Sequence, residues 1–202
     1  MSEDLTRVRA HLRAHFAAAG IETDPEVARI MFVGAEPIEV LRFGPGTDRM
    51  MHYASVGCAR LPMGDPSQIL ADPVNGPRAE LVLRLRVSGS DTGLARSLAA
   101  LASAPMVEGV VLAPDALLDL GQPLWMRESG AVPFTAVLLG DSDIADLPLA
   151  EPREPVHFLS AIPITATEAA WVRLKGAEAM RDAWRADGVD VFDPDRPASE
   201  PR

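Results

Sequence analysis

Residues 80–87 show the most regular alternation of apolar and polar side chains in this sequence. One face of an extended chain would carry Leu81, Leu83, Leu85 and Val87, and the other would carry Val82, Arg84 and Arg86. A period of two residues is typical of a β-strand in a half-buried sheet. We therefore expect a strand here, with one face against the core and the other against water.

Other segments follow either a strand pattern or a helix pattern. Further strands are expected at residues 29–33, 38–43, 50–57, 134–139 and 156–164. Apolar side chains three and four residues apart predict helices at 3–19 and 94–101, and Pro105 is expected to end the second. The predicted fold is thus of the mixed α/β (α+β) class.

Two helical stretches are expected near the C-terminus. Thr165 and Glu168 have the spacing of a capping box, which marks a helix start. Gly176 separates this helix from a second stretch at residues 177–186, which Gly188 ends. From residue 193 onward the chain is polar and rich in Pro, and this composition predicts a flexible tail.

Length and composition predict one domain. The chain has 202 residues, of which 48% are hydrophobic and 24% charged, as in ordinary globular proteins. We expect residues 1–192 to form a single domain, with its core at about residues 25–192 and an N-terminal helix at 3–19. Cys58 is the only cysteine, and no signal peptide or membrane span is evident, so the expected location is the cytoplasm.

The net charge of −10 limits the classes of partner. It repels phosphate backbones and anionic lipid headgroups, and the Arg residues form no basic stripe, so we expect neither nucleic acid nor membrane as a partner. A basic protein or peptide fits this charge. The alternative is that the acidic balance serves solubility alone.

Sequence motifs of catalysis are absent. There is no Gly-x-Ser-x-Gly, no Walker loop and no Gly-x-Gly-x-x-Gly, and His11 and His15 lack a third metal ligand nearby. We therefore predict no catalytic residue, no metal and no cofactor. Cys58 is expected to be a small buried side chain rather than a nucleophile. The alternative function is a small hydrolase or transferase that uses carboxylates or His157 in a cleft.

Four segments, taken in order, carry a resemblance to a known family. They are residues 51–57, residues 79–85, the helix at 94–101 with the strand at 134–141, and residues 156–164 before Thr165 and Glu168. In this combination the chain resembles the suppressor of fused (SUFU-like) domain family over residues 25–192, in its bacterial single-domain form. In this chain, Glu80, Leu81, Leu83, Arg84 and Leu85 match the family's middle strand, but the aromatic residue of that strand is missing. Ser160 stands where the family has a Gln.

The resemblance implies a mixed central β-sheet flanked by helices. It also implies a non-enzymatic, protein-binding function without a cofactor, of which an immunity protein that neutralises a toxin is one form. The animal relatives are two-domain regulators that hold a transcription-factor peptide, and this chain is too short for the second domain. A structural subunit that mainly self-associates remains a further alternative.

The candidate partner contacts are aromatic, basic and acidic residues. Tyr53 and Trp125 have the aromatic side chains that anchor interfaces, with burial in the domain's own core as the alternative. Arg84 and Arg86 suit an acidic segment of a partner, unless they pair with acidic residues of a covering helix. Asp141 and Asp143, together with Asp146, lie in an acidic linker that suits a basic partner or is simply solvated.

Overall fold

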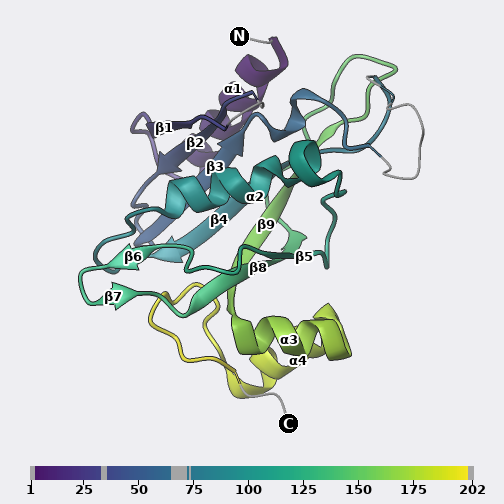
Figure 1. The fold of residues 1–202 in the computed structure, drawn as a ribbon. Helices are drawn as coiled ribbons and strands as arrows, with labels where there is room; N and C mark the ends of the chain where they lie inside the picture. Colours follow the sequence, from purple (N-terminus) through teal and green to yellow (C-terminus); the bar gives the residue numbers. More distant parts are fainter. Residues whose placement is uncertain (1–2, 33–35, 65–71, 73, 200–202) are drawn as a thin grey trace.

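The computed structural model describes residues 3–32, 36–64, 72 and 74–199. A seven-stranded sheet runs through the molecule in the order β1-β2-β3-β4-β9-β8-β5 (Figure 1). Its strands are β1 (Glu26–Ile30), β2 (Ile38–Phe43), β3 (Met50–Val56), β4 (Arg78–Arg86), β5 (Leu117–Asp119), β8 (Phe134–Asp141) and β9 (Val156–Thr165). A second sheet consists of β6 (Met126–Arg127) and β7 (Gly130–Ala131).

The sheet is mixed, as predicted. Strands β4 and β9 pair in parallel, with Glu80 opposite Phe158, whereas the other neighbouring strands pair antiparallel. The helices are α1 (Glu3–Ala18), α2 (Leu94–Glu108), α3 (Ala166–Lys175) and α4 (Ala177–Asp187), with a 3-10 turn, η1, at Cys58–Arg60. The capping box of Thr165 and Glu168 starts α3, as predicted from its spacing.

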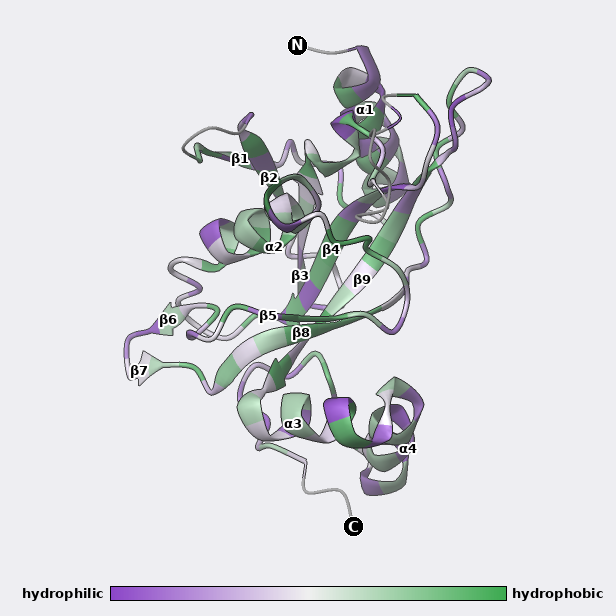
Figure 2. Cartoon of the chain, turned by 45° about the vertical axis from the view of Figure 1, so that its right-hand side comes forward, coloured by the Kyte–Doolittle hydropathy of each residue, from purple (hydrophilic) through white to green (hydrophobic). Residues whose placement is uncertain are grey.

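Helices cover both faces of the sheet. One face packs against α2, whereas α1 and the α3–α4 pair pack against the other. In Figure 2 the strands of the central sheet are accordingly mostly green. The expectation that β4 has one wet face holds only towards its end, because Glu80 and Val82 are buried on the side of the sheet that α1 covers. Arg86, at the end of β4, is exposed.

Two other predicted boundaries differ from the structure. Helix α2 continues through Pro105 to Glu108 and ends at Gly109, which has a φ of 70°. Pro105 stands in the last turns, where losing one amide donor costs less than ending a helix whose Leu98 and Leu101 are buried against the sheet. The first strand lies at Glu26–Ile30 rather than 29–33, and Val33 is outside the described residues.

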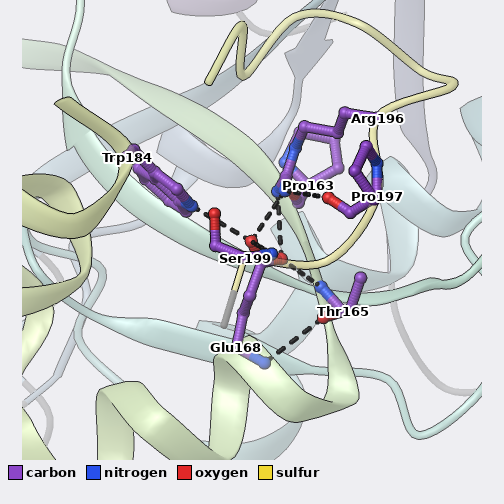
Figure 3. A network of polar contacts seen from close by, with 7 residues as sticks. All are labelled: Pro163, Thr165, Glu168, Trp184, Arg196, Pro197 and Ser199. Carbon is purple, nitrogen blue, oxygen red and sulfur yellow. Dashed lines mark hydrogen bonds and ion pairs between the residues drawn. The ribbon is translucent and has the colours of Figure 1, made fainter. Parts of the chain in front are cut away.

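The C-terminal segment is docked as far as it is described, in contrast to the flexible tail expected from residue 193. Arg196 and Ser199 are buried. Arg196 donates to both carboxylate oxygens of Glu168, at 2.6 and 3.0 Å, and to the carbonyl of Pro163 at 2.8 Å (Figure 3). The contacts that hold the segment are polar: besides the buried ion pair, Arg127 pairs with Asp195 and donates to the carbonyl of Pro194. A composition rich in Pro and polar residues does not indicate such contacts.

Among the described helices, none has the length and apolar character that a membrane crossing requires.

Candidate functional site

The two aromatic candidates lie in the core. Tyr53 and Trp125 are only 3% and 2% exposed, and the Trp125 ring stacks on Phe134 with centroids 5.5 Å apart. The Tyr53 hydroxyl donates to Asp91 and accepts from Nε of Arg42 at 3.3 Å. Burial, followed by the hydrogen bond to Asp91, raises the pKa of Tyr53. Neither ring offers exposed surface to a partner.

The two candidate arginines are paired within the chain. Nη2 of Arg84 lies 2.9 and 3.1 Å from the carboxylate oxygens of Asp143, and Nε of Arg86 lies 2.5 Å from Oδ2 of Asp190. Burial acts to raise the pKa of Asp143, but the hydrogen bond and charge of Arg84 outweigh it and lower the pKa. The acidic residues belong to a loop and to the C-terminal segment, not to a covering helix.

Asp141 and Asp146 border a pocket of about 410 Å³, which we call the Asp146 pocket. It lies where β8 ends and β9 begins. Its lining residues are Met63, Pro77, Val111, Leu112, Ala113, Pro114, Asp141, Ser142, Ile144, Asp146, His157, Phe158 and Leu159. Nδ1 of His157 lies 3.0 Å from Oδ1 of Asp146, and both side chains are about half exposed. The lining thus combines an apolar floor with two carboxylates and one imidazole.

One wall of the Asp146 pocket comes from the loop at residues 142–155, which α1 holds in place. Nε2 of His11 lies 2.6 Å from the carbonyl of Ala145, and Arg7 donates to the carbonyl of Pro148 at 2.6 Å. Nη1 of Arg153 lies 2.5 Å from Oδ2 of Asp4. The His11 ring also stacks on Phe158. The acidic linker is therefore a tethered loop, which sequence patterns did not indicate.

The sheet ends in β1 on one side and β5 on the other, and no other described strand pairs with the outer edge of either. Val27 on β1 and Met31 just after it are 54% and 69% exposed. A groove of about 250 Å³ follows β1, and among its lining residues Arg42 lies 3.0 Å from Glu26 and 3.4 Å from Asp91. Open strand edges carry unpaired backbone donors and acceptors.

Glu80 is a buried carboxylate whose role the sequence analysis did not predict. It accepts from Ser55 Oγ at 2.5 Å and from the amides of Gly57, Cys58 and Ala59 at 2.8, 3.3 and 3.1 Å. Burial raises its pKa, whereas these donors act to lower it. Glu80 therefore organises the turn after β3. In the sequence, Glu80 stood out only as an acidic residue at the start of a predicted strand and as one of the residues shared with the family's middle strand.

The surroundings of Cys58 do not favour thiol chemistry. Cys58 is buried, and burial followed by the nearby charge of Glu80 holds the pKa of its thiol well above the usual value. A thiol of this kind stays protonated and unreactive at neutral pH. Within residues 3–199, as far as the structure describes them, no three His, Cys, Asp or Glu residues gather as a metal site would require.

A model of the suppressor of fused protein family (SUFU) matches residues 34–197. The chain belongs to the suppressor of fused family. This confirms the resemblance found in the sequence, and the match includes β2, the Glu80 strand and the Glu168–Arg196 pair. A search of curated proteins gave no match.

Solved structures of the family share the fold at low sequence identity. A suppressor of fused homologue from Neisseria gonorrhoeae is 18% identical with a TM-score of 0.65, and the alignment covers 96% of this chain and 94% of the other. The Sufu–Fu complex gives 16% identity and a TM-score of 0.68, covering 96% and 91%. Drosophila Suppressor of Fused gives 16% and 0.67, covering 96% of this chain and 50% of that protein.

Proposed function

We propose that this suppressor of fused domain is a non-enzymatic protein-binding module that takes an extended segment of its partner on an open sheet edge. The observation that carries this proposal is the pair of open edges, β1 and β5, in a sheet whose two faces are covered by helices. An added strand satisfies the free backbone groups, and neighbouring pockets select side chains. A similar structure is that of Sufu in complex with Fu, which supports a protein as the partner.

A more specific form of this function is neutralisation of a toxin. The net charge of −10 favours a basic partner through electrostatic attraction. In the cytoplasm of a bacterial host, such a domain would bind the toxin and block its contacts. Co-expression tests this form, because the domain should restore growth of cells that make the captured partner, whereas a domain unable to bind should not.

Hydrogen exchange on a reconstituted complex tests the binding mode. A protein captured repeatedly from the native host would be purified and added to the domain, and amide exchange would be followed by mass spectrometry. We expect slower exchange in β1 (Glu26–Ile30) or β5 (Leu117–Asp119), with α4 (Ala177–Asp187) unchanged as the internal control. Protection confined to helices, or the repeated capture of no protein, would contradict the proposal.

A second candidate function is hydrolysis or group transfer in the Asp146 pocket. The contact of 3.0 Å between His157 and Asp146 favours it, because a carboxylate can orient an imidazole as a general base. A panel of p-nitrophenyl esters would be incubated with the wild type, with His157→Gln and with His15→Gln as the control. Turnover that is lost only in His157→Gln would support catalysis, whereas equal rates in all three support the binding module.

A further inference from the structure

The Asp146 pocket combines two kinds of surface that a single ligand can satisfy. We propose that it binds a basic segment of a partner protein, with one large apolar side chain in the pocket and a neighbouring Lys or Arg at Asp141 and Asp146. This deepens the protein-binding function proposed above and rests on it, because it names the chemistry of the partner. It is independent of which sheet edge is used.

The apolar part of the pocket has room for a large side chain. Its volume of about 410 Å³ is within the range of small-molecule sites, which is about 300–1,000 Å³. Leu112, Ile144 and Phe158 form its floor and belong to the buried core, whereas Val111 at the rim is 40% exposed. A Phe or Leu side chain that enters the pocket moves from water into contact with an apolar wall, and this transfer favours binding.

The charge at the rim selects a basic neighbour for this side chain. Asp141 and Asp146 are exposed, and none of the described residues of the lining is Lys or Arg. In the described chain Asp146 contacts the imidazole of His157, whereas the adjacent Asp143 is already paired with Arg84. A carboxylate beside an apolar wall attracts a cation more strongly than one in bulk water. An acidic or phosphorylated segment would be repelled.

The pocket is formed before a ligand arrives. The 142–155 loop is tethered to α1 through His11, Arg7 and Arg153, and Leu147 pairs with Val156 through two backbone hydrogen bonds of 2.9 Å. A preformed wall reduces the entropy that binding must otherwise remove. Asp146 on this wall and Asp141 at the end of β8 are therefore both held near the pocket.

Three capped dipeptides test the proposal by NMR titration of the full chain. The probe is N-acetyl-Phe-Arg-amide, with N-acetyl-Phe-Glu-amide and N-acetyl-Gly-Arg-amide as comparisons. We expect the first to shift the amides of Leu112, Ile144 and Phe158 and to bind roughly tenfold more tightly than either comparison, because it alone has both groups. The same spectra would be recorded for variants of the two carboxylates.

The variants separate a local contact from the general charge of the protein. The double substitution Asp141→Asn and Asp146→Asn should weaken binding about tenfold, or about threefold for each exposed carboxylate, whereas Asp187→Asn on α4 should change it less than about twofold. Equal affinity for the Arg and Glu probes, shifts at other residues, or an equal effect of Asp187→Asn would overturn the proposal. Cleavage of the probe would assign the pocket to catalysis and also overturn it. A negative result here leaves the hydrogen-exchange test of the sheet edges unaffected.

Discussion

Replacement of Arg196 by Met tests whether the buried ion pair fixes the C-terminal segment. The side chains of Arg196 and Glu168 are 3% and 0% exposed, so neither has water to replace a lost partner. Arg196→Met retains much of the apolar stem but removes two of the five donors to Glu168 (Figure 3). The remaining donors are Trp184 Nε1 and the amides of Thr165 and Ser199.

The expected loss at pH 7 is about 3–4 kcal/mol. Removing one partner of a buried ion pair typically costs about 3–5 kcal/mol, because the other charge is left uncompensated. We place the value at the lower end of that range since three neutral donors still reach Glu168. The double variant Glu168→Gln with Arg196→Met removes the isolated charge, so it should recover at least about 1 kcal/mol of this loss.

Urea unfolding followed by tryptophan fluorescence measures the change. Of the three tryptophans, Trp184 lies in the cluster that α3 and α4 form with the sheet. With a slope of about 2 kcal/mol per molar, the midpoint should fall by roughly 1.5–2 M. Arg185→Met is the control, because Arg185 pairs with Asp182 at the exposed surface of α4 and should lose less than about 0.5 kcal/mol. A loss below about 1 kcal/mol for Arg196→Met would refute the reasoning.

Arg196→Met should also reverse the effect of pH that Glu168 has on the free energy of unfolding. Burial acts to raise the pKa of this carboxyl, but Arg196, the Thr165 amide and Trp184 outweigh it and hold the pKa below the ordinary 4.5. In the wild type the contribution of Glu168 is therefore present above about pH 4.5 and lost as the pH falls through the lower folded pKa. In Arg196→Met burial prevails and raises this pKa, so the deficit should be largest at neutral pH and shrink towards pH 4.5.

Three smaller predictions concern single residues. Thr165→Ala should cost about 1 kcal/mol in urea unfolding, because it removes the acceptor for the Glu168 amide; an unchanged midpoint would exclude this role of the cap. Burial, with Arg84, lowers the pKa of His52 from 6.5 to about 4, so wild-type stability should decline as the pH falls from 6.5 to 4, and His52→Gln should flatten this decline. The Cys58 thiol should react with Ellman's reagent only as fast as the chain unfolds, and rapid reaction in the folded protein would show that the site is open.

The sequence predicted the local elements well because their signals are local. The side-chain period located α1 and β4, and the capping box located the start of α3 to the residue. The outward direction of Arg84 and Arg86 on β4 was predicted correctly, whereas the burial of Val82 on the same face was not. Val82 is buried in a cluster with residues of α1, more than 60 positions away in sequence, and no pattern within β4 indicates that contact.

The candidate site could be predicted only in part, since its properties depend on pairs that are distant in sequence. Arg84 and Asp143 were predicted as separate partner contacts, yet they bind each other across 59 positions. Asp141 was predicted from the same acidic linker and does line a pocket. Asp143 is paired because Arg84 lies within reach of it, whereas Asp141 faces the pocket. The alternation of residues along a strand does not predict which of the two carboxylates lies near an arginine.

The distribution of the charged residues explains why the edges and the Asp146 pocket remain as binding surfaces. Arg42, Arg84 and Arg86 are each held by carboxylates of their own chain, so a partner that used them would first have to break an existing pair. Breaking such a pair costs free energy, and a new contact adds affinity only when it contributes more free energy than that. Within the described residues, Asp141 forms no ion pair, Asp146 contacts the imidazole of His157, and no strand pairs with the outer edge of β1 or β5. A partner therefore has fewer existing contacts to break at these surfaces than at the three arginines.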